Sequence, residues 1–204
     1  DKLNEYATAF GLGEHTGIEI GDAAGNLAQN KAGENQAPWA AFGQASYLFT
    51  PIQLANYIAT LVSGGKHCDA HLLKAVKSYD NTQVLAVGNT DPKNTVDISD
   101  EALTAVKKGM HDLTTTGSLA PYFKDCVVDA GAKTGTAQVN KDTENNGVFV
   151  CFAPYDDPEI AVSIVIEQGG SGSALASTAV SILNAYFSAD EIGTAIIGEN
   201  QLMQ

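Results

Sequence analysis

Residues 148–166 have the sequence VFVCFAPYDDPEIAVSIVI, and they decide the fold class of this chain. Two nearly continuous apolar runs, 148–153 and 160–166, flank a turn-forming segment between Pro154 and Pro158. Apolar runs of this length on either side of a turn predict an antiparallel pair of strands. Because neither run alternates with polar residues, we expect the sheet to be covered on both faces.

Helical patterns lie on both sides of this strand pair. The segment TPIQ at 50–53 has the pattern of a capping box with proline in the first turn, and GG at 64–65 is a helix stop signal. Ser99 is expected to cap a second helix that ends at Gly117. The other expected elements are a helix at 2–10, a strand at 16–20, a loop at 21–38, strands at 71–76, 84–87 and 132–139, and a helix at 173–187. The mixed order favours an α+β fold, an antiparallel sheet flanked by helices.

Composition narrows the classes of function. The chain has 204 residues, 44% of them hydrophobic, and a formal charge of −13. All 11 basic residues are lysines, so a nucleic-acid surface is not expected. Without arginine, a bound anion must be held by lysine, hydroxyl groups or backbone N–H groups. No apolar run approaches the 18 residues of a membrane span, and three widely spaced cysteines do not form a disulfide framework.

The segment KTGTAQ at 133–138 is the strongest candidate site. In a strand, Lys133 and Gly135 would project to one face and Thr134 and Thr136 to the other. Gly135 would let a ligand backbone approach the strand closely, and free edge groups could pair with an extended peptide. The lysine and the hydroxyls could bind a carboxylate. The tripeptide Lys-Thr-Gly also occurs by chance in surface strands, so the surrounding motifs decide whether it indicates a functional site.

That context is an ordered series of motifs. FGLGEHTGI at 10–18, FGQ at 42–44 and TPIQLA at 50–55 precede KTGTAQ, and FVCFAP at 149–154 follows it. From about residue 6 to residue 187, the series resembles the C-terminal part of the transpeptidase domain of class B penicillin-binding proteins. The resemblance implies a penicillin-binding-protein/β-lactamase-like fold. It also implies serine acyl transfer that cross-links the stem peptides of peptidoglycan.

The resemblance also implies roles for individual residues. Lys133 would supply positive charge and take part in proton transfer, and Thr136 would contribute its backbone N–H to an oxyanion hole. Thr134 and Thr136 would hold the carboxylate of the substrate or of a β-lactam, beside Gly135 and Ala137. No cofactor and no metal are implied. The implied partners are stem peptides ending in D-Ala-D-Ala, β-lactams and the rest of the same domain, at the extracytoplasmic face of the bacterial cytoplasmic membrane.

Two of the three motifs expected of such a domain are missing. Ser63-Gly64-Gly65-Lys66 matches Ser-x-x-Lys as a string, but two glycines after a helix cannot hold serine and lysine on one helical face. There is no Ser-x-Asn, and the YDN at 79–81 lies in a turn too far along the chain. We therefore expect residues 1–188 to be the C-terminal portion of one transpeptidase domain, followed by a tail at 189–204. Alone, this portion should be inactive towards β-lactams.

Weaker patterns leave other interpretations open. In a strand, His67, Asp69 and His71 would share a face as metal ligands, but an exposed loop is the simpler interpretation. The glycines at 11–13 fall short of a dinucleotide fingerprint, and those at 169–172 are typical of a flexible turn. Two other functions stay open: a non-catalytic β-lactam-sensing module, and a related D,D-carboxypeptidase or β-lactamase. A domain portion should expose apolar surface, so a dimer, a swapped oligomer or poor stability in isolation is expected.

Overall fold

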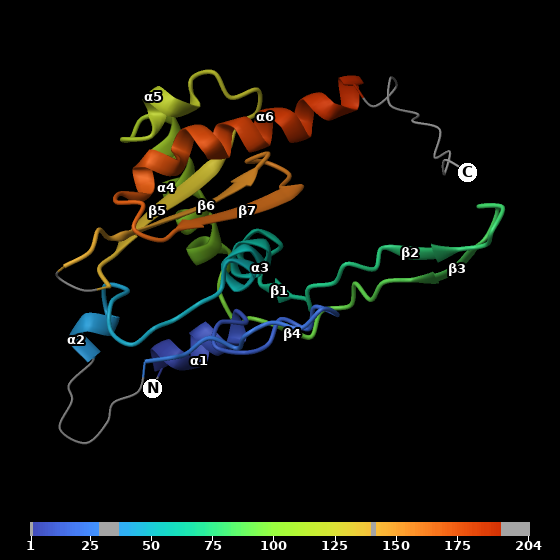
Figure 1. The fold of residues 1–204 in the computed structure, drawn as a ribbon, viewed down its shortest axis with the longest axis horizontal. Coiled ribbons are helices and arrows are strands. Elements are labelled where there is room, and N and C mark those ends of the chain that lie inside the picture. The colour runs from blue at the N-terminus through green and yellow to red at the C-terminus, as the bar shows by residue number, and fades with distance from the viewer. Residues whose placement is uncertain (1, 29–36, 140–141, 193–204) are drawn as a thin grey trace.

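A computed structural model describes residues 2–28, 37–139 and 142–192. Its centre is a three-stranded antiparallel sheet in the order β5-β6-β7 (Figure 1). The strands are β5 (Gly131–Ala137), β6 (Asn146–Ala153) and β7 (Ile160–Ile166). The two apolar runs thus pair as expected, with Phe149 opposite Ile164. The predicted α+β class with helices flanking an antiparallel sheet is confirmed.

Helices cover both faces of this sheet, as predicted from its continuous apolar strands. On one face, α6 (Ala176–Ile192) and α5 (Ala120–Phe123) pack over a core that contains Phe149 and Cys151. On the other face, α3 (Pro51–Val62) and α4 (Asp100–Thr115) pack over Val150 and Phe152. Successive residues of β6 therefore point to opposite cores, which is why this strand carries no polar alternation.

The helix boundaries follow their capping signals. Thr50 accepts a hydrogen bond from the backbone of Gln53, whose side chain accepts one from the Thr50 N–H, so the predicted capping box starts α3. Ser99 caps α4 as expected. The final helix begins with a single 3₁₀ turn, η1 (Gly172–Leu175), and α6 continues beyond residue 187 to Ile192. The rest of the expected tail lies outside the described residues.

The predicted strand at 16–20 is wrong. Thr16 is buried, and both its N–H and its hydroxyl donate to the Asp22 carboxylate at 2.8 and 2.7 Å. Gly17 and Gly21 have φ of 84° and 75°, values that interrupt an extended strand. The segment is therefore an irregular loop that side-chain hydrogen bonds hold in place. It follows helix α1 (Lys2–Ala9), and part of the predicted 21–38 loop forms the short helix α2 (Ala37–Ala40).

Residues 66–95 form an excursion that projects away from the helices and the sheet (Figure 1). At its base, β1 (Lys66–His67) pairs with β4 (Asn94–Thr95). Farther out, β2 (Ala75–Lys77) and β3 (Val84–Val87) form the predicted strand pair as a two-stranded ribbon, but β2 begins only at Ala75, so the predicted strand over 71–74 is wrong. The Glu19 carboxylate accepts the N–H groups of Leu72 and Leu73, which ties the start of the ribbon to the preceding loop.

Candidate active site

The Lys-Thr-Gly segment lies on β5, at an edge of the three-stranded sheet. Within the described residues, β5 pairs with β6 on one side only, and Gly135 lies opposite Val148. The Lys133 ammonium donates to the Thr134 carbonyl, and the Gln44 side-chain amide donates to the Thr136 carbonyl at 3.4 Å. These two carbonyls therefore point away from β6.

The direction of these carbonyls fixes the direction of the neighbouring N–H groups. In an antiparallel strand, the N–H and C=O of one residue point to the same edge, and every second residue shares that edge. The N–H groups of Thr134 and Thr136 thus point to the edge of β5 opposite β6, which no other described strand covers. An extended ligand beside β5 would meet two backbone donors and the exposed Lys133 side chain.

A neighbouring segment packs close to the threonines. The backbone N–H of Gly172 donates to the Thr136 hydroxyl at 3.4 Å. A Cβ atom on Gly172 would lie 2.3 Å from the carbonyl oxygens of both Gly135 and Val148. The glycine turn before the last helix therefore packs directly onto the backbone of β5 and β6, and it does more than give the chain a flexible turn.

A cavity of about 360 Å³ lies beside these residues. Gly135, Thr136 and Ala137 form part of its wall. The rest comes from the segment between Phe42 and Phe49, from Leu54 on α3, and from residues of β6 and β7. A Cβ on Gly135 would lie 3.3 Å from the Val148 Cβ, a crowded contact that glycine avoids. The sequence indicated residues 42–44 only as one of the motifs in the ordered series, not as part of the site. The contact from Gln44 to Thr136 has no local sequence signal, since the two residues are 92 positions apart.

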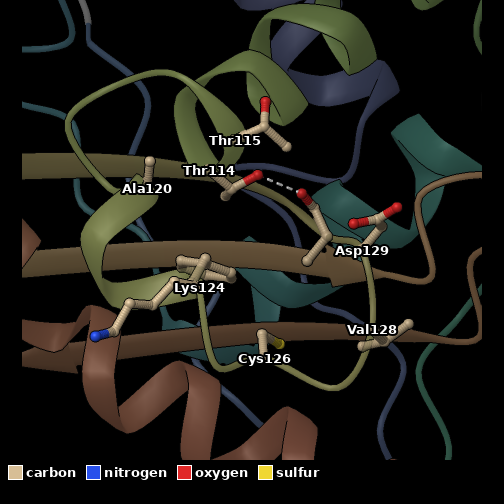
Figure 2. Close-up of a pocket in the computed structure, with 9 residues that line it drawn as sticks. Thr114, Thr115, Ala120, Lys124, Cys126, Val128 and Asp129 are labelled. Atoms are coloured by element: carbon tan, nitrogen blue, oxygen red, sulfur yellow. Dashed lines mark hydrogen bonds between the residues drawn. The ribbon is translucent and has the colours of Figure 1, made fainter.

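A second cavity, of about 330 Å³, lies at the end of α4 and the start of β5 (Figure 2). The buried Thr114 hydroxyl in its wall donates to the Ala130 carbonyl at 2.6 Å. Cys126 also lines it, and burial raises the pKa of that thiol. A raised pKa disfavours the thiolate, so Cys126 lacks the character of a nucleophile. None of the predicted site residues lines this cavity.

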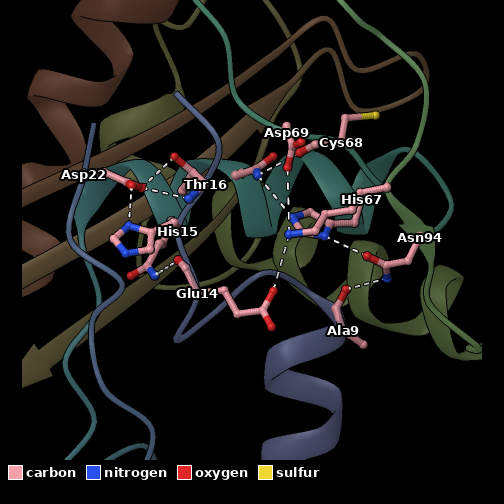
Figure 3. Close-up of polar contacts among 12 residues, drawn as sticks. Ala9, Glu14, His15, Thr16, Asp22, His67, Cys68, Asp69 and Asn94 are labelled. Atoms are coloured by element: carbon pink, nitrogen blue, oxygen red, sulfur yellow. Dashed lines mark hydrogen bonds and ion pairs between the residues drawn. The ribbon is translucent and has the colours of Figure 1, made fainter. Parts of the chain in front are cut away.

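The histidine-rich segment has a structural explanation. His67 is buried, its Nε2 accepts from the Asn56 amide, and its Nδ1 donates to the Asn94 carbonyl oxygen at 2.9 Å (Figure 3). Asn94 in turn donates to the Ala9 carbonyl at 2.9 Å, which joins α1 to the base of the excursion. Both ring nitrogens of His67 are thus engaged. The described residues include no group of three or more His, Cys, Asp or Glu side chains that could hold a metal ion.

The loop that contains Asp22 is also held by a polar cluster (Figure 3). Asp22 accepts from the N–H and hydroxyl of Thr16 and contacts the Nδ1 of His15 at 2.9 Å. These contacts lower the pKa of Asp22 from 3.8 to about 2, and the hydrogen bond from the Thr16 hydroxyl has the largest effect. The cluster stabilises the loop that replaces the predicted strand.

The other sequence motifs lie away from β5. Ser63 caps the end of α3, and its hydroxyl donates to the carbonyls of Thr60 and Lys66. Gly64 and Gly65 have φ of 77° and 84°, so the helix stops there and Lys66 enters β1. This confirms that Ser63 and Lys66 do not share a helical face. Tyr79 and Asn81 lie in the turn between β2 and β3, at the far end of the ribbon (Figure 1).

The chain matches a known protein family. The model of the penicillin-binding protein transpeptidase domain matches residues 1–186. The chain belongs to this family. The resemblance to the class B transpeptidase domain, predicted from the motif series, is thereby confirmed, and the fold agrees with it.

Individual relatives agree with the family. The peptidoglycan D,D-transpeptidase MrdA of Escherichia coli K12 is 29% identical over 90% of this chain, which covers 33% of that protein. Penicillin-binding protein 2A of Bacillus subtilis is 30% identical over 81% of the chain, which covers 25% of that protein. The chain therefore spans about a third or less of the length of these relatives.

Solved structures share the arrangement of elements. Penicillin-binding protein 2B of Streptococcus pneumoniae R6 aligns with a TM-score of 0.80 at 25% identity, over 92% of this chain and 32% of that one. Penicillin-binding protein 2 of Pseudomonas aeruginosa, in complex with WCK 5153, aligns with a TM-score of 0.76 at 28% identity, over 95% of this chain and 45% of that one. Within the described residues, no helix has the length and apolar character needed to cross a membrane.

Proposed function

We propose that this chain is the C-terminal portion of a peptidoglycan D,D-transpeptidase domain and that it forms one wall of the active site. The observation that carries the proposal is the position of Lys-Thr-Gly-Thr on β5, the edge strand of the described sheet, with the Thr134 and Thr136 carbonyls turned away from β6. In the parent enzyme, a serine and its base outside this chain would perform the nucleophilic step.

In this mechanism the serine attacks the penultimate D-alanine carbonyl of a stem peptide. The terminal D-alanine leaves, and the amine of a second stem peptide then takes the acyl group. A β-lactam would acylate the same serine. The chemistry assigned to this chain is binding and electrostatic. The Thr136 N–H would stabilise the oxyanion, the hydroxyls of Thr134 and Thr136 would hold the substrate carboxylate, and Lys133 would supply positive charge and take part in proton transfer.

The arrangement suits an anion-binding role without arginine. Lys133 is exposed at the edge of β5, and Thr136 is exposed beside it. Because Gly135 has no side chain, an extended peptide could approach the backbone of β5 without a steric barrier. The parent would act at the extracytoplasmic face of the bacterial membrane, held there by an anchor outside these residues.

A fluorescent penicillin tests the proposal. The 204-residue chain should form no covalent adduct, whereas the full-length parent should form one that survives denaturing electrophoresis. In the parent, Lys133→Ala should slow acylation by about 10²-fold or more, a loss of the size seen for oxyanion and charge-stabilising groups. The matched control is Lys124→Ala on the far side of the sheet, which should leave the rate unchanged.

Three outcomes would contradict the proposal. A covalent adduct with the 204-residue chain would show that the nucleophile lies within it. A parent that binds penicillin reversibly, without acylation, would instead support the non-catalytic sensing module. Hydrolysis of the β-lactam with rapid turnover would support the related hydrolase.

A further inference from the structure

Ala45 has a backbone conformation that is unfavourable for alanine. Its φ is 89°, in the left-handed region, where the Cβ of a residue other than glycine crowds a neighbouring carbonyl oxygen. The described residues contain two other non-glycines with positive φ, Asn81 and Gln168, and both lie in turns next to paired strands. Ala45 instead lies in the irregular segment between α2 and α3, and its exposed methyl group cannot form a hydrogen bond that offsets the strain. Such strain persists only where neighbouring contacts impose it.

The residues next to Ala45 are held on both sides. On its C-terminal side, the Asn26 side-chain amide donates to the Ser46 carbonyl at 2.6 Å. Asn26 and Leu48 also exchange two backbone hydrogen bonds of 2.7 and 3.0 Å. On its N-terminal side, the Gln44 N–H donates to a carbonyl of α2 at 2.9 Å. The chain therefore cannot relax at Ala45 unless the bonds on one side of it break.

Asn26 is itself connected to the interior of the molecule. Gln53, a fully buried residue of α3, donates from its side-chain amide to the Ala24 carbonyl at 2.7 Å. A Cβ on Gly25 would lie 2.3 Å from the Leu48 carbonyl oxygen, so the two segments pack backbone against backbone. Hydrogen bonds and close contacts thus connect α3 to Asn26, and Asn26 to the residues that follow the strained alanine.

The turn at Ala45 determines where the Gln44 side chain lies. Gly43 and Ala45 have φ of 81° and 89°, so the chain turns on each side of Gln44. From this position the Gln44 amide reaches the Thr136 carbonyl at 3.4 Å. A hydrogen bond of this length is weak and is lost after a small displacement. Because Ala45 joins Gln44 to residues 46–48, a change of its φ would redirect the chain and withdraw the amide from β5.

We propose that Asn26 and Ala45 are positioning residues of the transpeptidase site. Asn26 holds the chain after Ala45, so that this alanine keeps its positive φ, and the resulting turn holds Gln44 against the Thr136 carbonyl. This inference rests on the proposed function, because it takes the Thr136 N–H as the donor that stabilises the transition state. It adds two residues that act on that donor only through Gln44.

Acylation of the full-length parent by a fluorescent penicillin tests the inference with a double-mutant cycle. Asn26→Ala should slow acylation about 10-fold, because Ala45 can then relax to a negative φ and Gln44 leaves β5. Asn26→Ala combined with Gln44→Ala should be no slower than Gln44→Ala alone. The matched control is Asn89→Ala, on an exposed asparagine of the 66–95 excursion, which should be acylated at the wild-type rate.

The substitution Ala45→Gly separates positioning from a general effect on folding. Glycine adopts a φ of 89° without strain, so Asn26→Ala/Ala45→Gly should recover the wild-type acylation rate to within about 2-fold. In the isolated 204-residue chain, Ala45→Gly should also raise the melting temperature, by about 2–4 °C. Ala41→Gly, on an exposed alanine without a positive φ, is the matched control and should lower it.

A spectroscopic readout tests the contact without acylation. In the isolated chain, the NMR chemical shift of the Thr136 carbonyl carbon should change in Gln44→Ala and in Asn26→Ala, and Asn26→Ala/Ala45→Gly should restore it. A parent that penicillin never acylates would contradict the proposed function, and the carbonyl shift would then decide whether Asn26 and Ala45 position Gln44. Wild-type acylation of Asn26→Ala, no rescue by Ala45→Gly, or an unchanged carbonyl shift in Asn26→Ala would overturn the inference.

Discussion

Gly172 packs against the backbone of Gly135: a Cβ on Gly172 would lie 2.3 Å from the Gly135 carbonyl oxygen. The turn before the last helix and the strand that carries Lys-Thr-Gly therefore touch through two residues without side chains. This close approach lets the Gly172 N–H reach the Thr136 hydroxyl. Small residues at both positions thus couple the packing of α6 to the position of β5.

The first prediction concerns this contact. Gly172→Ala would place a methyl group against two carbonyl oxygens, so we expect it to lower the free energy of unfolding by about 1–3 kcal/mol. Urea unfolding followed by circular dichroism measures the change. Gly109→Ala is the matched control, because a Cβ there meets nothing within 4 Å. In the interior of α4, that change should stabilise the chain by about 1 kcal/mol. Equal stability of Gly172→Ala and wild type would contradict the close approach.

Gln44 is predicted to position the edge of β5. Its side-chain amide donates to the Thr136 carbonyl, and Thr136 carries the proposed oxyanion donor. In the full-length parent, Gln44→Ala should slow acylation by a fluorescent penicillin about 10-fold, since a displaced donor weakens transition-state stabilisation. Gln83→Ala, on the outer ribbon, is the control and should acylate at the wild-type rate. An unchanged acylation rate in Gln44→Ala would show that Gln44 does not position β5.

Acid should weaken the loop at Asp22. Its pKa falls from 3.8 to about 2 because the hydroxyl and N–H of Thr16 and the imidazole of His15 favour the carboxylate. A lowered pKa in the folded state means a contribution to stability that is present above about pH 4 and is lost as the pH falls towards 2. Asp22→Asn should therefore show a smaller loss of stability between pH 5 and pH 2 than the wild type. Asp125→Asn, on an exposed side chain, is the control. Identical pH profiles for Asp22→Asn and wild type would refute the prediction.

His67 is predicted to be a structural residue. Its ring is buried, and both nitrogens are hydrogen-bonded, so His67→Ala leaves a cavity and removes one hydrogen bond each from the Asn56 amide and the Asn94 carbonyl oxygen. We expect a loss of about 2–4 kcal/mol. His71→Ala, on an exposed histidine, should change stability by less than about 0.5 kcal/mol. A zinc titration of the wild-type chain checks the alternative, because a metal site would raise the melting temperature with added Zn²⁺.

The cysteines should differ in reactivity. Burial raises the pKa of Cys151 to about 12, and its side chain has no exposed surface. Only the thiolate attacks iodoacetamide, so native Cys151 should stay unmodified at pH 8, while the partly exposed Cys68 reacts. Mass spectrometry after digestion locates the label, and all three cysteines should react in urea. Labelling of Cys151 in the folded chain at the rate of Cys68 would show that the β6 core opens readily.

Local patterns predicted most of the fold because their physical causes are local. The capping box at Thr50, the Ser99 cap and the glycine stop at 64–65 each act within one helical turn. The apolar runs around Pro154 needed only their length and continuity to predict paired strands. The incorrect prediction of a strand at 16–20 shows where local patterns are insufficient. There the Asp22 carboxylate competes for the backbone and side chain of Thr16, and glycines with positive φ interrupt the extended conformation.

By itself, the sequence determined the fold class, the family resemblance and the Lys133–Ala137 segment as the candidate site, because each depends on residue types at short, fixed spacings. Only the tertiary structure decided that β5 is an edge strand among the described residues, that Gln44 and Gly172 meet Thr136, and that His67 is enclosed by Asn56 and Asn94. These contacts join residues 11 to 92 positions apart. Their geometry depends on how the helices pack on the two faces of the sheet, and no local pattern of residues records that packing.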